Sequence, residues 1–167
     1  MRLRLILAGL LVAALSSAGI AASLKVGTPA PQFEVTAMDG RVIGATALRG
    51  KVTLVHFWAT WCPPCLEEMP ALDKFYRDHR KDGFEVVAIS VDDAADTAKV
   101  REFSKRFAFP VAMKEAARVD AFGRLWALPL SFLIDRKQIL RKSDWLGSET
   151  IDAGALDKLV LPLLSEN

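Results

Sequence analysis

The chain has 167 residues, of which 51% are hydrophobic and 25% are charged, and its formal net charge is +2. This length and composition suit one domain with a sizeable apolar core and leave little room for a second. A nucleic-acid-binding domain would be strongly basic. We therefore expect one domain and no nucleic-acid partner.

The first 22 residues differ from the rest of the chain. Arg2 and Arg4 precede an apolar run over residues 5–15, and small residues follow as far as Ala22. This is the layout of a secretory signal peptide. Because the uncharged stretch borders on membrane-spanning length, an uncleaved anchor is the alternative. In either case residues 23–167 form a domain outside the cytoplasm, and we expect a periplasmic location.

The segment before the cysteines is predicted to be extended. Residues 33–36 and 41–43 are separated by Asp39-Gly40, a strong signal for a tight turn, so an N-terminal β-hairpin is expected. The run 52–58 is apolar and β-branched, which suits a strand covered on both faces of a sheet.

Helices and strands alternate after the cysteines. Apolar residues at helical spacing predict a helix over 66–80, with a kink at Pro70. Residues 84–91 indicate a second buried strand, 100–107 another helix face and 110–113 a further short strand.

The last third of the chain is predicted to close the fold. A helical stretch is expected over 116–122, followed by a hairpin of 131–134 with 139–140. Residues 150–161 form a terminal helix that Pro162 interrupts. The expected class is α/β, with a central mixed sheet flanked by helices and an N-terminal hairpin.

Both cysteines of the chain, Cys62 and Cys65, lie in one Cys-x-x-Cys motif. A redox dithiol needs one sulfur that is a thiolate near neutral pH and a second that resolves the mixed disulfide. If a helix follows the strand 52–58, Cys62 lies at the helix N-terminus, where free amides and the macrodipole stabilise a thiolate. Cys65, one turn further, is expected to be buried.

Two prolines separate the cysteines. Pro63 and Pro64 are preorganised for the first turn of a helix but have no amide hydrogen for the sulfur. The nearest donor is then the amide of Cys65. We therefore expect the pKa of the Cys62 thiol to be lowered moderately, toward the thioredoxin value of about 7 and not toward about 3.5.

A metal site is the main structural alternative for the cysteine pair. Zinc needs two more ligands, and the histidines of the chain are His56, inside an apolar strand, and His79, late on the following helix. Cu(I), which suits thiolates, stays open as a binding or delivery role. We expect no metal and no cofactor besides the redox-active disulfide.

At this point the sequence resembles the TlpA/ResA-like branch of the thioredoxin superfamily, over residues 26 to about 164. The resemblance rests on motifs in a fixed order, and any one of them would be weak alone. They are Val26-Gly27-x-Pro29-Ala30-Pro31-x-Phe33, Asp39-Gly40, Leu48-Arg49-Gly50-Lys51, Phe57-Trp58-Ala59-Thr60-Trp61-Cys62-Pro63-Pro64-Cys65 and Pro129-x-x-Phe132-Leu133-Ile134-Asp135.

The resemblance implies a thioredoxin fold in which Cys62 attacks and Cys65 resolves. It also implies a cis peptide bond between Leu128 and Pro129 beside the disulfide, where the Leu128 backbone would pair with an extended client segment. Glu68 matches a buried acid near the active site of family members. Its position three residues after Cys65 fits proton exchange with the resolving thiol, although a first-turn acid also simply favours the helix dipole.

Two further residues near the motif have competing interpretations. His56 stands where thioredoxin carries an aspartate, so it would relay protons for Cys65 or, alternatively, be a core histidine satisfied by hydrogen bonds. Trp61 is expected to be an exposed surface for clients, whereas Trp58 belongs to the core. Trp126, Leu130 and Ser131 depart from the commonest family pattern, which bears on client preference.

The functional expectation is reduction of protein disulfides by a monomeric periplasmic protein. Because that compartment is oxidising, the electrons would come from a membrane donor of the thiol-reductant type. Family members serve cytochrome c maturation, so apocytochrome c is among the implied clients. Oxidation of client thiols uses the same residues and is the first alternative. Peroxidase activity is a weaker one, because a Cys-x-x-Cys pair at a helix start is not the usual peroxidatic arrangement.

Overall fold

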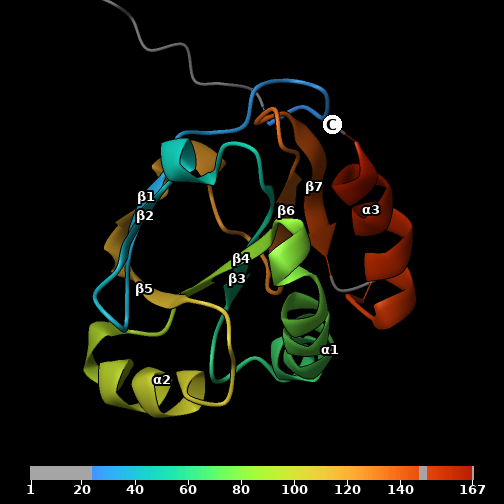
Figure 1. Ribbon diagram of the computed structural model, residues 1–167. Helices are drawn as coiled ribbons and strands as arrows, with labels where there is room; N and C mark the ends of the chain where they lie inside the picture. The colour runs from blue at the N-terminus through green and yellow to red at the C-terminus, as the bar shows by residue number, and fades with distance from the viewer. Residues whose placement is uncertain (1–23, 147–149, 167) are drawn as a thin grey trace, which may run out of the picture.

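The protein is described by a computed structural model that covers residues 24–146 and 150–166, so the predicted leader lies outside the described residues. The described chain forms a seven-stranded sheet in the order β2-β1-β5-β4-β3-β6-β7 (Figure 1). The strands are β1 Glu34–Ala37, β2 Val42–Gly44, β3 Val52–Trp58, β4 Phe84–Ser90, β5 Val111–Arg118, β6 Leu130–Ile134 and β7 Leu140–Leu146. The helices are α1 Pro63–His79, α2 Thr97–Ser104 and α3 Ala153–Ser165.

The centre of the sheet is parallel and its margins are antiparallel. Strand β4 runs parallel to both β3 and β5, whereas β6 is antiparallel to β3 and β1 is antiparallel to β5. The predicted mixed sheet, both predicted hairpins and the buried strand 52–58 are therefore confirmed. In this register the last residue of β3, Trp58, lies opposite the last residue of β4, Ser90, at the carboxyl end of the parallel strands.

Two apolar clusters cover the two faces of the sheet. Leu54 and Trp58 of β3 pack in the cluster that holds the buried side chains of α1, α2 and α3. Val55 and Phe57 belong to the opposite cluster, which the N-terminal segment and short 3₁₀ turns cover. This division follows from the two-residue period of a strand. It places His56 on the same face of the sheet as Leu54 and Trp58, beneath the helices.

The structure corrects the prediction of a helix over 116–122. Strand β5 continues to Arg118, and Asp120–Phe122 form a 3₁₀ turn. Val35 of β1 pairs with Ala117, so hydrogen bonds to a neighbouring strand override the helical propensity of the segment Lys114–Ala117.

The terminal helix is also longer than predicted. Helix α3 continues through Pro162 to Ser165. Pro162 is exposed and Leu163 is buried in the core. The carbonyl that loses its helical partner at the proline therefore lies on the exposed side of the helix, while packing of Leu163 holds the last turn.

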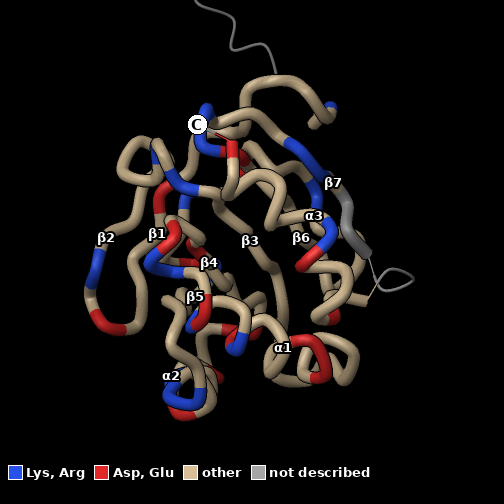
Figure 2. Tube along the Cα trace, turned by 45° about the vertical axis from the view of Figure 1, so that its right-hand side comes forward, with Lys and Arg blue, Asp and Glu red and all other residues tan. Residues whose placement is uncertain are grey.

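Charged residues of both signs are interspersed along the described chain, as the blue and red segments of the trace show (Figure 2). Within residues 24–146 and 150–166, none of the helices combines the length and the apolar character that a membrane crossing requires.

Candidate active site

The two cysteines lie at the start of α1 and form a disulfide bond. Cys62 is the N-cap residue, and its Sγ accepts a hydrogen bond from the Cys65 amide at 3.3 Å. Cys62 is 5% exposed and Cys65 is fully buried. The predicted geometry, with one sulfur at the helix end and the second one turn inside, is thus present, and Cys62 is the sulfur that an incoming group reaches first.

The prolines between the cysteines occupy the first two helical positions. Pro63 and Pro64 are both exposed. Because neither has an amide hydrogen, Cys65 is the first residue of the helix that donates one to Cys62. Backbone stabilisation of a Cys62 thiolate therefore depends on this donor together with the helix dipole.

The two tryptophans before the motif have opposite environments. Trp58, the last residue of β3, is fully buried, whereas Trp61 has 61% of its surface exposed. Trp61 directly precedes Cys62, so an aromatic surface borders the accessible sulfur. Both environments agree with the sequence-based expectation.

Glu68, three residues after Cys65 on α1, is buried, with 2% of its surface exposed. Its Oε1 accepts a hydrogen bond from the Ile151 amide at 3.0 Å, and its Oε2 has no hydrogen-bond partner among the described residues. Burial raises the pKa of Glu68 to about 7, although the bond from Ile151 acts in the opposite direction. Glu67, in contrast, is exposed. With this pKa, the Glu68 carboxyl group is partly protonated near neutral pH.

His56 is fully buried on the face of β3 that α1 covers. Its Nδ1 shares a hydrogen bond of 2.8 Å with Ser131 Oγ on β6, and its Nε2 has no partner among the described residues. Burial lowers the pKa of His56 to about 4, so the ring is neutral at physiological pH. His56 is thus a neutral histidine of the core with one of its two ring nitrogens hydrogen-bonded, and its role as a proton relay stays a prediction.

The peptide bond between Leu128 and Pro129 is cis. Pro129 is buried, and Leu128 packs against the apolar cluster that contains Cys62 and Cys65. The cis bond that the resemblance implies is thus present in the loop before β6.

One part of the site was not anticipated from the sequence. Asp92, which follows β4, is fully buried and accepts hydrogen bonds from Thr60 and Ser90. Thr60 lies two residues before Cys62. The sequence signal that could have identified Asp92 is Ser-Val-Asp at the carboxyl end of a buried strand. Polar groups at that edge of a parallel sheet often belong to a ligand-binding or active site.

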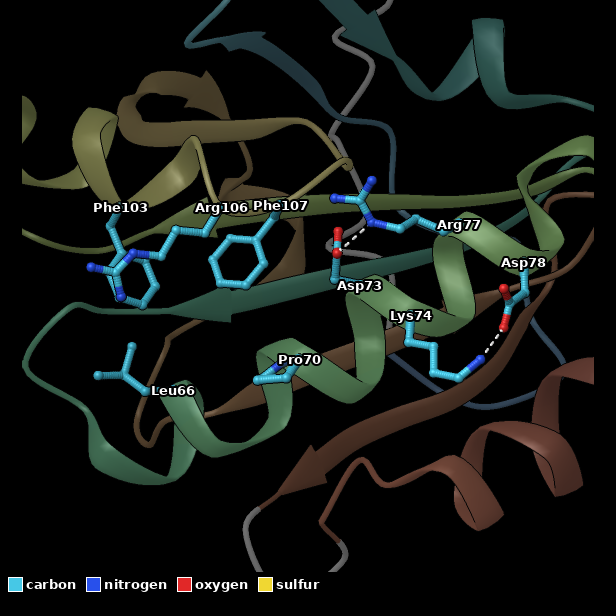
Figure 3. A pocket seen from close by; sticks show the side chains of 9 residues that line it. All are labelled: Leu66, Pro70, Asp73, Lys74, Arg77, Asp78, Phe103, Arg106 and Phe107. Atoms are coloured by element: carbon cyan, nitrogen blue, oxygen red, sulfur yellow. Dashed lines mark hydrogen bonds and ion pairs between the residues drawn. The ribbon is translucent and has the colours of Figure 1, made fainter.

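A groove of about 560 Å³ runs along α1 beside α2 (Figure 3). It is lined by Leu66, Pro70, Asp73, Lys74, Arg77, Asp78, Phe103, Arg106 and Phe107. Lys74 pairs with Asp78 at 2.6 Å, and Arg77 pairs with Asp73 at 2.7 Å. The disulfide is not part of this lining, so the redox chemistry belongs to the end of α1 and not to the groove.

His79, the second candidate metal ligand, pairs with Asp82 at 2.9 Å near the end of α1. Across the described ranges, the structure brings together no group of three or more His, Cys, Asp or Glu side chains that could hold a metal ion.

This sheet with a Cys-x-x-Cys disulfide at the start of α1 defines a thioredoxin-like protein. A crystal structure of a thiol:disulfide interchange protein of the thioredoxin family from Chlorobium tepidum TLS superposes with a TM-score of 0.70 at 29% identity, covering 86% of this chain and 100% of that one. The predicted thioredoxin fold is therefore confirmed. Residues 26–143 match the AhpC/TSA family, to which the chain belongs.

Two proteins named thiol-disulfide oxidoreductase ResA are similar to the chain in sequence. The thiol-disulfide oxidoreductase ResA of Geobacillus thermodenitrificans is 35% identical over 123 residues, covering 72% of this chain and 69% of that protein. ResA of Bacillus cereus is also 35% identical, over 115 residues that cover 68% of this chain. The match spans 65% of the length of this Bacillus relative. The predicted resemblance to ResA-like proteins is confirmed.

Proposed function

We propose that the protein is a thiol-disulfide oxidoreductase that reduces disulfide bonds of client proteins in the periplasm. The observation that carries this proposal is the Cys62–Cys65 disulfide at the N-terminus of α1, with the Cys65 amide donating to Cys62 Sγ. The similarity to proteins named thiol-disulfide oxidoreductase supports it.

In the reduced protein, the Cys62 thiolate attacks one sulfur of a client disulfide. An S–S bond forms between Cys62 and the client, and the second client sulfur leaves as a thiolate that takes up a proton. Cys65 then loses its proton and attacks Cys62 Sγ, which releases the first client sulfur. Two electrons pass to the client, and Cys62 and Cys65 end as the disulfide seen in the structure.

In this proposal Glu68 takes the proton of the resolving thiol. It lies one helical turn after Cys65 and is buried, and a carboxyl group with a pKa of about 7 is half ionised near neutral pH. A base whose pKa matches the working pH transfers protons most efficiently. In this scheme His56 stays neutral and positions the strand beneath the motif through its bond to Ser131.

The environment of Cys62 favours the reducing direction. A strongly stabilised thiolate makes a dithiol pair an oxidant, because the reduced form then lies lower in free energy. Pro63 and Pro64 withhold two backbone donors from Cys62, which limits that stabilisation. The electrons for the next cycle come from a membrane donor of the thiol-reductant type, and apocytochrome c is one of the clients that the family resemblance supports.

The reduction potential of the cysteine pair tests the proposal. The purified protein is equilibrated with glutathione buffers, and the thiols are trapped by alkylation and counted by mass spectrometry. A potential near roughly −270 mV supports a reductant, whereas one near roughly −120 mV overturns the proposal in favour of an oxidase of client thiols.

A further inference from the structure

The turn between β3 and α1 is held by a buried carboxylate from a different part of the chain. Asp92 Oδ2 accepts a hydrogen bond from the Thr60 amide at 2.8 Å, and Asp92 Oδ1 accepts one from the Thr60 hydroxyl. The hydroxyl of Ser90 donates to Oδ2 at 2.7 Å. Both carboxylate oxygens are therefore engaged, and two of the three donors belong to a single residue of the turn.

The Asp92 carboxylate is buried. Asp92 and Ser90 are both fully buried, and no lysine or arginine within residues 24–146 and 150–166 pairs with Asp92. Burying a charge is unfavourable unless hydrogen bonds compensate. The three donors therefore offset the cost of burying the Asp92 carboxylate. These hydrogen bonds connect the buried Asp92 carboxylate directly to Thr60, two residues before Cys62.

The turn that Asp92 holds leads directly into Cys62. The Cys62 amide donates to the Ala59 carbonyl at 3.2 Å, so residues 59–62 form a closed turn that includes Thr60. At the other end of this turn, Cys62 Sγ meets the Cys65 amide at 3.3 Å. Because Pro63 and Pro64 have no amide hydrogen, the Cys65 amide is the helix donor that contacts the sulfur. Once the disulfide is reduced, a displaced turn would lengthen this contact.

We propose that Asp92 is a positioning residue for Cys62: through Thr60 it holds the turn 59–62 so that the sulfur stays against the Cys65 amide, and thereby it sets the acidity of the attacking thiol. The inference rests on the proposed function in taking Cys62 as the attacking sulfur.

The test compares variants of Thr60 in the full-length protein. Thr60→Val keeps the size and β-branching of the side chain but removes the hydroxyl, whereas Thr60→Ser keeps the hydroxyl. Thr97→Val is the matched control, because the Thr97 hydroxyl also donates one hydrogen bond, to the Ala94 carbonyl at 2.7 Å, at the start of α2. The rate of Cys62 alkylation by iodoacetamide is measured in the reduced proteins as a function of pH.

We expect Thr60→Val to raise the pKa of the Cys62 thiol by about one unit, which lowers the thiolate fraction about tenfold at pH values below the pKa. Thr60→Ser and Thr97→Val should keep the value of the unmodified protein. In an Asp92→Asn background, Thr60→Val should shift the pKa by less, because the two changes weaken the same link. If Asp92→Asn does not fold, the Thr60 variants alone decide.

An unchanged thiol pKa in Thr60→Val overturns the inference, even if the variant melts at a lower temperature, because a purely structural role affects stability alone. The alkylation assay needs no client. A protein that fails to reduce disulfides but shows the pKa shift would contradict the proposed function and leave the role of Asp92 intact.

Discussion

The carboxylate of Glu68 accepts a hydrogen bond of 3.0 Å from the backbone amide of Ile151. Glu68 lies on α1 one turn after Cys65, and Ile151 lies two residues before α3, so the bond joins the cysteine helix to the last helix. Its Oε2 has no hydrogen-bond partner in the described part of the chain, so with a pKa of about 7 this carboxyl group can bind or release a proton while its position is fixed.

Replacing Glu68 with glutamine should slow resolution of the mixed disulfide. The amide keeps an oxygen for the Ile151 bond but cannot take a proton from Cys65, and loss of a general base costs about 10² to 10⁴ in rate. In the unmodified protein the rate of resolution should rise with pH through about 7, where Glu68 becomes ionised. Stopped-flow measurement of the single-turnover reaction with a disulfide client checks both effects.

Glu67→Gln provides the control for that experiment. Glu67 is exposed and neighbours Glu68 on the same helix, so this variant removes the same charge without affecting the buried site. If Glu68→Gln and Glu67→Gln resolve the mixed disulfide at the same rate and with the same pH profile, Glu68 has no part in proton transfer.

The two buried titratable groups should make stability depend on pH in opposite directions. The pKa of Glu68 is raised from 4.5 to about 7, so the folded state holds more protons in this window and stability falls as pH rises. The pKa of His56 is lowered from 6.5 to about 4, so the folded state holds fewer protons and stability falls as pH drops. Between about pH 4.5 and 6.5 the two slopes oppose each other.

Single variants should separate the two slopes. In Glu68→Gln only the His56 contribution remains. The free energy of unfolding should then rise by about 2 kcal/mol between about pH 4.5 and 6.5. In His56→Asn, whose amide reaches Ser131 as Nδ1 does, stability should fall with pH instead. Urea unfolding of the oxidised proteins at constant ionic strength measures both. If the free energy of unfolding depends on pH in the same way in both variants, burial does not shift the pKa values of Glu68 and His56 in opposite directions.

Much of this fold was predictable because its signals are local. The β-branched run of β3, the Asp39-Gly40 turn and the cysteine motif each specify their own conformation, and all appear where the sequence places them. The environments of Cys65 and Trp61 followed from their positions relative to the start of the helix. Periodicity and capping chemistry were sufficient for this part of the site.

The errors arise where distant residues decide the conformation. The sequence predicts a helix over 116–122, but pairing between β1 and β5 continues the strand to Arg118. The hydrogen bonds of Asp92 to Thr60 join residues 32 positions apart, and those of Glu68 to Ile151 join residues 83 positions apart. Spacing along the chain carries no information on such contacts, so the role of Asp92 emerges only from the folded chain.

Replacing Cys65 with serine should trap mixed disulfides between Cys62 and client proteins. The attacking sulfur is unchanged in this variant, but the group that resolves the intermediate is lost, so the complex persists. Non-reducing electrophoresis followed by mass spectrometry of the trapped species would locate the bond. Cys62→Ser is the matched control and should trap nothing, because Cys65 is fully buried. Trapping only in Cys62→Ser would reverse the assigned roles of the two cysteines.

Trp61 should contribute to the recognition of protein clients and not to the stability of the fold. Its side chain is 61% exposed and borders Cys62, and an aromatic contact of this kind contributes about 0.5–1.5 kcal/mol. Trp61→Ala should therefore lower the rate of protein disulfide reduction several-fold, up to roughly tenfold. The rate with a small disulfide such as oxidised glutathione should hardly change, because that substrate offers little surface to the indole ring.

Trp126→Ala is a useful comparison, since Trp126 is 65% exposed three residues before Pro129. Equal losses with both substrates in Trp61→Ala would mean that the tryptophan affects the sulfur itself and not client binding.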